Sequence, residues 1–189
     1  MIYEQYYTEE LDNGHGTNLL ISIIPDTDTG NPFDAWDTFG TLKTFRSPSE
    51  FESFLEHLMQ IKAAFETGNT QYEYYVIYAT RETIFKEYGR KRMSRKLWKT
   101  ACECLHAEHE TYEMWLNGDV FGYTIMDMET GEDVESCWGF YGFDYCLEQA
   151  KEIALAYRKP LPAWVKNWGI LPGLTPDMIG RPEKLYNAM

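Results

Sequence analysis

The chain has 189 residues, of which 44% are hydrophobic and 16% are aromatic. This composition is typical of a globular domain with a sizeable core and excludes an intrinsically disordered protein. No apolar run approaches the roughly 18 residues of a membrane-spanning helix, and the acidic, polar first residues lead us to expect no signal peptide. Four cysteines are too few for a disulfide framework at this length, so we expect a reducing, cytoplasmic compartment.

The net charge of −13 is distributed unevenly along the chain. Residues 72–99 contain eight basic and three acidic residues, whereas residues 100–157 contain thirteen acidic residues and one base. Residues 1–71 are also acidic, with twelve acids against three bases. An acidic surface keeps a protein soluble, but it can also imitate nucleic acid or dock on a basic partner. Composition alone leaves all three interpretations open.

The first part of the chain predicts strands separated by polar loops. Residues 2–7 are typical of a short edge strand, residues 9–16 of a polar turn and residues 18–24 of a buried strand. A loop rich in Pro, Gly and Asn follows and carries four carboxylates: Asp26, Asp28, Asp34 and Asp37. Carboxylates can bind calcium or magnesium, but the spacing does not fit an EF-hand, so we favour a solvated loop. Trp36 and Phe39 are expected to fold back onto the core.

A helix is predicted from Pro48 to Gly68, with strands at residues 41–45 and 72–79 on either side. Ser47 is the candidate N-cap, proline follows in the first turn, and a glutamate three positions after Ser47 completes a capping box. Apolar residues then recur at helical spacing until the glycine. The aromatic side chains of the second strand could stack on bases, but core packing is the interpretation we favour.

Six bases gather between a short helix and a long one. Thr80 is a candidate cap for a helix over residues 81–88, and Ser94 for a helix that runs to about Leu116. We name these bases the basic segment: Arg90, Lys91, Arg92, Arg95, Lys96 and Lys99. Cations in the first turn of a helix oppose its dipole, which indicates another task for them. Contact with the phosphates of a nucleic acid and pairing with the chain's own carboxylates are equal alternatives.

The long helix also carries thiols and imidazoles. Cys102, His106 and His109 share one face at positions i, i+4 and i+7, with Glu110 and Glu113 nearby, and such a set could bind zinc. The spacing is not that of a zinc finger, and the other cysteines could join only through the fold. We therefore expect buried thiols, surface histidines, no metal site and no Cys–His catalysis.

Residues 118–142 predict the β-hairpin around which the chain is organised. Alternating β-branched and aromatic residues indicate strands at 120–127 and 134–138, and Gly131 can take a positive φ in the turn between them. The turn and the second strand carry four carboxylates, which we name the acidic tip: Glu129, Glu132, Asp133 and Glu135.

Three aromatic residues end the hairpin, and a helix follows over residues 144–157. Trp138, Phe140 and Tyr141 are expected to seal the end of the hairpin against this helix, so that replacing Trp138 with alanine would destabilise the whole domain.

These elements predict an α+β fold: a mostly antiparallel sheet with about three helices on one face. Residues 1–158 are expected to form a single domain. Residues 159–189 contain five of the eight prolines together with two tryptophans, and they predict a C-terminal arm that wraps the domain or a second subunit of a homo-oligomer.

The stretch over residues 79–152 resembles a family of uncharacterised proteins of phages, plasmids and mobile elements. In that family a KEYG sequence and a basic stretch precede a long helix, as KEYGRKR does here. A GDVYGF-like strand and a DSCWGFYG-like turn follow, matched here by GDVFGY and ESCWGFYG. The earlier NPFDAWDTFGTL is similar to the family's WDNLGT-type element. The similarity covers a little under half of the chain. LKTFRSPSEF differs from the family pattern, His106 and His109 match nothing in it, and the arm lies outside the similarity.

The resemblance implies a context. Small acidic proteins of mobile elements frequently work by blocking host defence enzymes, and such inhibitors act by binding alone. It therefore implies an anti-CRISPR or antirestriction inhibitor in the cytoplasm of a bacterial host, with no catalysis and no cofactor. Such an inhibitor would bind a defence nuclease, or the RNA- or DNA-bound complex of that nuclease, through the acidic tip. Two alternatives stay open: a nucleic-acid-binding accessory protein that uses residues 90–99, and a zinc-dependent hydrolase built from Cys102, His106 and His109.

Overall fold

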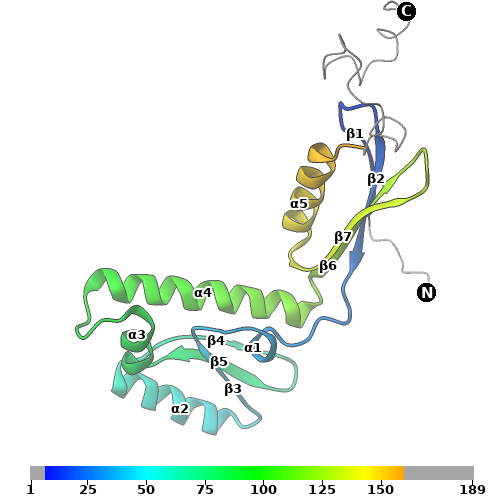
Figure 1. Cartoon of the computed structure of the whole chain (residues 1–189). Helices are drawn as coiled ribbons and strands as arrows, with labels where there is room; N and C mark the ends of the chain where they lie inside the picture. Colours follow the sequence, from blue (N-terminus) through cyan, green and yellow to red (C-terminus); the bar gives the residue numbers. More distant parts are fainter. Residues whose placement is uncertain (1–6, 160–189) are drawn as a thin grey trace, which may run out of the picture. The chain divides into compact units, whose positions relative to one another are not determined.

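The computed structural model describes residues 7–159, which form seven strands and five helices (Figure 1). In chain order they are β1 (Tyr7–Asp12), β2 (Asn18–Pro25), α1 (Pro32–Ala35), β3 (Thr41–Phe45), α2 (Pro48–Ile61), β4 (Ala64–Asn69), β5 (Tyr74–Ala79), α3 (Arg81–Tyr88), α4 (Arg95–Asn117), β6 (Val120–Asp127), β7 (Asp133–Tyr141) and α5 (Phe143–Ala156). The predicted α+β class is confirmed. Within this range no helix combines the length and the apolar character needed to cross a bilayer.

The chain divides after Ala156 into two units, and nearly all of the described residues belong to the first. The predicted C-terminal arm, apart from Lys159, lies outside the described residues, as do residues 2–6 of the predicted edge strand. The division into a domain over residues 1–158 and an arm therefore stays a prediction.

The described strands form two antiparallel sheets, where the sequence suggested one. The four-stranded sheet has the order β1-β2-β6-β7, and the three-stranded sheet has the order β3-β5-β4. In the first sheet Ile21 of β2 lies opposite Ile125 of β6. β1 includes residues 9–12, which were predicted to belong to a polar turn. They form a strand instead, because Glu9 and Glu10 pair with residues of β2 despite their charge. The prediction of a turn is wrong for residues 9–12, whereas residues 13–16 do lie in the turn that connects β1 to β2.

α2 is shorter than predicted. It ends at Ile61 because Lys62 adopts the left-handed conformation, with φ of 55°. The chain then enters β4, which pairs with β5, so that the predicted helix to Gly68 is wrong in its last turns. Gly68 lies opposite Tyr75, and any side chain at this position would occupy the space of the Tyr75 ring. Ser47 occupies the N-cap position, but its side chain makes no capping hydrogen bond.

Helices cover both faces of the three-stranded sheet, with α4 on one side and α2 on the other (Figure 1). Alternate residues of β5 explain this arrangement. Tyr75 and Ile77 pack in a cluster with Leu105 of α4, whereas Val76 packs in a second cluster with Leu58 of α2. A strand that is apolar on both faces must be shielded from water on both faces, here by a helix on each side. The prediction that the helices gather on one face of the sheet is therefore wrong for this sheet.

α5 packs on the four-stranded sheet against β2 and β6. Its inner face consists of small side chains, since Cys146, Ala150 and Ala154 are all fully buried. Small residues let the helix approach the sheet closely, and fully buried side chains such as Ile21 and Ile125 supply the apolar sheet residues of this part of the core.

Candidate functional site

The turn between β6 and β7 is built by one buried carboxylate. Asp127 is 2% exposed and accepts hydrogen bonds from the backbone N–H groups of Glu129 (2.9 Å) and Thr130 (3.3 Å). The Gly131 N–H donates to the Asp127 carbonyl at 2.7 Å, and Gly131 has the positive φ, 70°, that the sequence predicted. These bonds hold the turn in one conformation. The backbone of the turn is therefore held by hydrogen bonds at the point where the acidic side chains project from it.

The acidic tip lies on this turn and on the start of β7. All four of its side chains, Glu129, Glu132, Asp133 and Glu135, are exposed. Within residues 7–159 no lysine or arginine forms an ion pair with Glu132, Asp133 or Glu135. Carboxylates without neighbouring cations produce a negative potential that attracts a basic surface.

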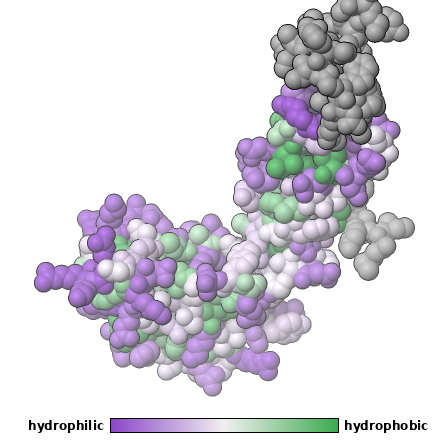
Figure 2. Space-filling view, viewed as in Figure 1, coloured by the Kyte–Doolittle hydropathy of each residue, from purple (hydrophilic) through white to green (hydrophobic). Residues whose placement is uncertain are grey.

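The basic segment joins α3 to α4. α3 ends at Gly89 in the left-handed conformation, and α4 begins after Ser94, whose hydroxyl accepts a hydrogen bond from the Leu97 N–H at 3.1 Å. Ser94 and Thr80 are thus confirmed as N-caps. Figure 2 shows hydrophilic residues gathered at the end of the molecule where the loop from α3 enters α4.

All six bases of this segment are exposed, and one of them is paired. Lys99 lies 3.3 Å from the Glu103 carboxylate, one turn further along α4. In the described part of the chain no ion pair involves the other five bases: Arg90, Lys91, Arg92, Arg95 and Lys96. Intramolecular pairing therefore accounts for Lys99 alone within residues 7–159, and the remaining five cations are available to an anionic ligand.

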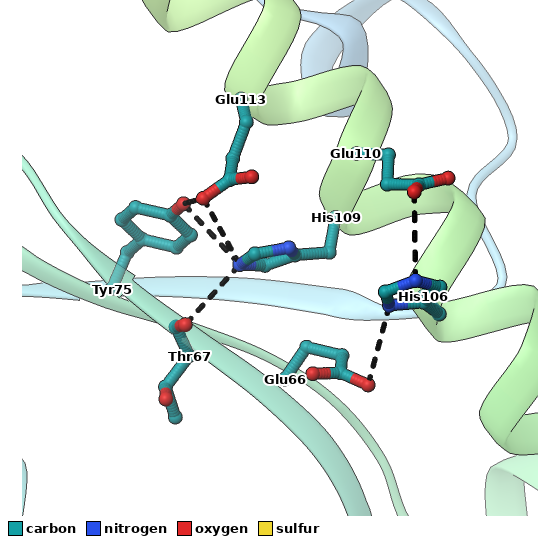
Figure 3. A network of polar contacts seen from close by, with 7 residues as sticks. All are labelled: Glu66, Thr67, Tyr75, His106, His109, Glu110 and Glu113. Carbon is teal, nitrogen blue, oxygen red and sulfur yellow. Dashed lines mark hydrogen bonds and ion pairs between the residues drawn. The ribbon is translucent and has the colours of Figure 1, made fainter.

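The histidines of α4 make contacts with the three-stranded sheet (Figure 3). His109 is 9% exposed, and its Nε2 lies 3.2 Å from the Thr67 carbonyl and 3.4 Å from the Tyr75 hydroxyl. The same hydroxyl donates to the Glu113 carboxylate at 3.4 Å. Burial, and secondarily Glu113, raise the pKa of Tyr75, which stays a neutral donor. This network connects α4 to β4 and β5.

His106, by contrast, lies on the exposed side of α4 between two carboxylates. Its ring nitrogens are 3.7 Å from Glu66 and 3.5 Å from Glu110. Cys102 packs against the core, and burial raises the pKa of its thiol, which disfavours the thiolate that zinc requires. Within residues 7–159 no group of three or more His, Cys, Asp or Glu residues is placed to hold a metal ion.

Two expectations about these side chains are wrong. His109 is buried rather than on the surface, because its ring fills the space between α4 and the sheet. Cys137 is exposed rather than buried, because it lies on β7 at the edge of the four-stranded sheet. Cys146 is buried as expected, whereas Cys102 and Cys104 are half-buried.

The four aspartates of the loop after β2 do not form a cluster. Asp26 accepts a hydrogen bond from the Asp28 N–H at 3.3 Å, and Asp34 lies in the first turn of α1. The cap of α1 is Asn31, whose side chain accepts from the Phe33 N–H at 2.9 Å. Asp37 is exposed. Trp36 is 52% exposed, contrary to expectation, whereas Phe39 packs against the core as predicted.

The aromatic residues at the end of β7 differ from one another. Phe140 contacts Tyr145 of α5, with the ring centroids 5.9 Å apart, so the expected contact with the helix is confirmed for this residue. Trp138 lies over Gly122 and remains 41% exposed, so it is not sealed in the core. Its partial exposure lowers the stability loss that we expect on replacing it with alanine.

The histidines of α4 could be picked out from the sequence, but the residues of the sheet that contact them could not. Glu66, Thr67 and Tyr75 contact the histidines of α4 from β4 and β5, more than thirty residues away in the chain. No local pattern indicates such contacts, and the residues of β4 were predicted as the end of a helix.

Comparison with known proteins adds no family assignment. No family model, no curated protein and no solved structure matches the chain. The resemblance to proteins of mobile elements stays a prediction, and the two charged surfaces are the features of the molecule that bear on its function.

Proposed function

We propose that the chain is a non-catalytic protein of a mobile element that inhibits a host defence nuclease, CRISPR-associated or restriction, by binding the nuclease or its nucleic-acid-bound complex. One observation supports this most directly: the chain carries an exposed acidic tip and an exposed basic segment, and most of their charges have no partner within residues 7–159. Exposed charges without an intramolecular partner produce a surface potential that can attract an oppositely charged molecule.

Each surface suits a different part of such a target. Nucleases bind the phosphates of their substrate with Arg and Lys, and a rigid acidic turn can occupy the same positions. The basic segment suits the phosphates of the RNA or DNA that the nuclease carries. Binding by complementary charge needs no active site.

The test is inhibition of cleavage by a panel of defence nucleases of a bacterial host. One variant carries Glu129→Lys, Glu132→Lys, Asp133→Lys and Glu135→Lys. A control variant with the same net charge carries lysine at four exposed carboxylates outside the tip: Glu10, Glu52, Glu56 and Glu110. We expect the tip variant to lose inhibition and the control to keep it. Absence of inhibition by the wild type, or equal inhibition by both variants, contradicts the proposal.

A second candidate function is favoured by the basic segment itself. Five cations that form no ion pair within residues 7–159 lie on a loop and in the first turn of a helix, and they can bind nucleic acid without any nuclease. Electrophoretic shift of duplex DNA or RNA tests this, with Arg90→Gln, Lys91→Gln and Arg92→Gln as the variant. A shift that the variant abolishes, together with no inhibition of any nuclease, would place the accessory function first.

A further inference from the structure

A pocket lies where α2 ends and where α3 and α4 begin. It has a volume of about 420 Å³ and is lined by Lys62, Arg81, Met93, Ser94, Arg95 and Trp98. The pocket is shallow and open to solvent, since four of its six lining residues are exposed. No carboxylate lines it. A pocket along α5 is different, because Asp144, Glu148 and Glu152 line it together with one lysine.

The three cations of this pocket come from three elements. Lys62 is the C-cap of α2, Arg81 is the first residue of α3 and Arg95 is the first residue of α4. All three are exposed, and none of them forms an ion pair within residues 7–159. In a chain of net charge −13, three cations around a pocket without a carboxylate are an arrangement that selects for a multiply charged anion.

The aromatic ring of the pocket adds a second kind of contact. Trp98 is half-buried: it packs against the core cluster around Leu105 and also lines the pocket. The cluster holds the indole in place, so a planar group can stack on it without further ordering. Met93 supplies an adaptable apolar contact to the same ligand.

We propose that this pocket binds one nucleotide unit, with the phosphate held by Lys62, Arg81 and Arg95 and the base stacked on Trp98. A phosphate alone would use the cations only, whereas a nucleotide would also contact the part of the indole that lines the pocket. The site does not depend on inhibition of a nuclease. It shares Arg95 with the basic segment and extends to two cations outside it.

The nucleotide is that of a single strand. The loop that carries Arg90, Lys91 and Arg92 leads directly to Met93, so further phosphates of a strand would meet further cations. A free mononucleotide brings the same phosphate and base but lacks these additional contacts. The two sources therefore differ in affinity.

The test measures binding to the full-length chain by calorimetry and by tryptophan fluorescence. The probes are adenosine and uridine 5′-monophosphates, ribose 5-phosphate, inorganic phosphate, a 5′-phosphorylated single-stranded octanucleotide and a phosphoserine peptide. We expect the octanucleotide to bind most tightly, the mononucleotides to bind measurably, and ribose 5-phosphate to bind about tenfold more weakly than the mononucleotides. Mononucleotides should also quench fluorescence in the wild type but not in Trp98→Phe.

The variants locate the site. The double variant Lys62→Gln/Arg81→Gln should weaken mononucleotide binding by about tenfold or more, while Lys86→Gln, an exposed base of α3 that does not line the pocket, should leave it unchanged. Equal binding of base-free phosphates, tighter binding of the phosphopeptide, or equal effects of the double variant and Lys86→Gln would each overturn the proposal. None of these results depends on whether the chain inhibits a nuclease.

Discussion

Glu108 holds a distant loop to the long helix. Its carboxylate accepts hydrogen bonds from the backbone N–H groups of Phe39 and Gly40, the second at 2.8 Å. Glycine is needed at position 40, because a Cβ there would lie 2.6 Å from Ile77 and 2.7 Å from Leu105. One half-buried carboxylate thus joins the start of β3 to α4 across 68 residues of chain.

We expect Glu108→Gln to lower the free energy of unfolding by about 1–3 kcal/mol, since the amide has one acceptor oxygen for two N–H donors and lacks the charge. Urea denaturation followed by circular dichroism measures the change. Glu110→Gln is the control, because Glu110 lies on the same helix but is exposed and pairs with His106. Equal midpoints for the two variants would show that the Glu108 bonds contribute nothing.

Cys146 makes stability depend on pH in the alkaline range. Burial raises the pKa of this thiol from 9.0 to about 12, so between these values the unfolded chain releases a proton that the folded chain retains. Stability should therefore be unaffected below pH 9 and should fall as the pH rises above it, by up to about 1.4 kcal/mol per pH unit for this one proton.

The measurement is the slope of unfolding free energy between pH 9 and pH 10, compared between the wild type and Cys146→Ala, so that the tyrosines, which also begin to ionise in this range, contribute equally to both. Cys146→Ala should flatten this slope whatever its effect on overall stability. Cys137→Ala should leave the slope as it is, since Cys137 is exposed. A slope that Cys146→Ala does not change would refute the assignment.

At the scale of elements, the sequence predicts what local interactions determine. The caps at Thr80 and Ser94 and the positive φ of Gly131 depend on neighbours within a few residues, and all three are confirmed. β4 could not be predicted, because Ala64–Asn69 is a strand only by pairing with β5. The division into two sheets has the same cause, since the partner of a strand is not written in its own residues.

The candidate sites, too, could be predicted only where local interactions determine them. Charged residues next to a turn or a helix start are exposed for local reasons, so the exposure of the acidic tip and the basic segment could be anticipated. The pocket could not: Lys62, Arg81 and Arg95 are separated by nineteen and fourteen positions, and only the packing of α2, α3 and α4 brings them together.

Gly68 provides a test of β4, because the strand and the predicted helix end give different stability losses for the same substitution. In a strand against Tyr75, Gly68→Ala displaces the tyrosine ring and should destabilise the fold by about 1–3 kcal/mol. If Gly68 instead ended a helix, with no ring against it, the same change would cost no more than about 1 kcal/mol. Gly30→Ala is the control, since a Cβ at Gly30 meets no atom within 4 Å. Thermal melts of the two variants distinguish the readings.

At the scale of the whole molecule, charge is sorted by position. The acidic tip belongs to the hairpin of the four-stranded sheet, and the basic segment belongs to helices that pack with the three-stranded sheet. Both are exposed, so their interactions act through water and are screened by salt. This screening separates a charge-based inhibitor from one that binds through an apolar patch.

Binding of the wild type to a nuclease that it inhibits should therefore weaken steeply between 0.1 and 1 M salt, because the Debye length falls from about 10 Å to about 3 Å. Calorimetry or surface plasmon resonance over this range gives the slope of log Kd against log salt. Reversal of the acidic tip should reduce both the affinity at 0.1 M and the slope, with little change in stability, since surface substitutions usually shift it by no more than about 0.5 kcal/mol.

Neutralising Arg90, Lys91 and Arg92 should lower the slope for nucleic acid while leaving binding to the nucleic-acid-free nuclease intact. An affinity that does not change with salt would show that neither charged surface makes the contact.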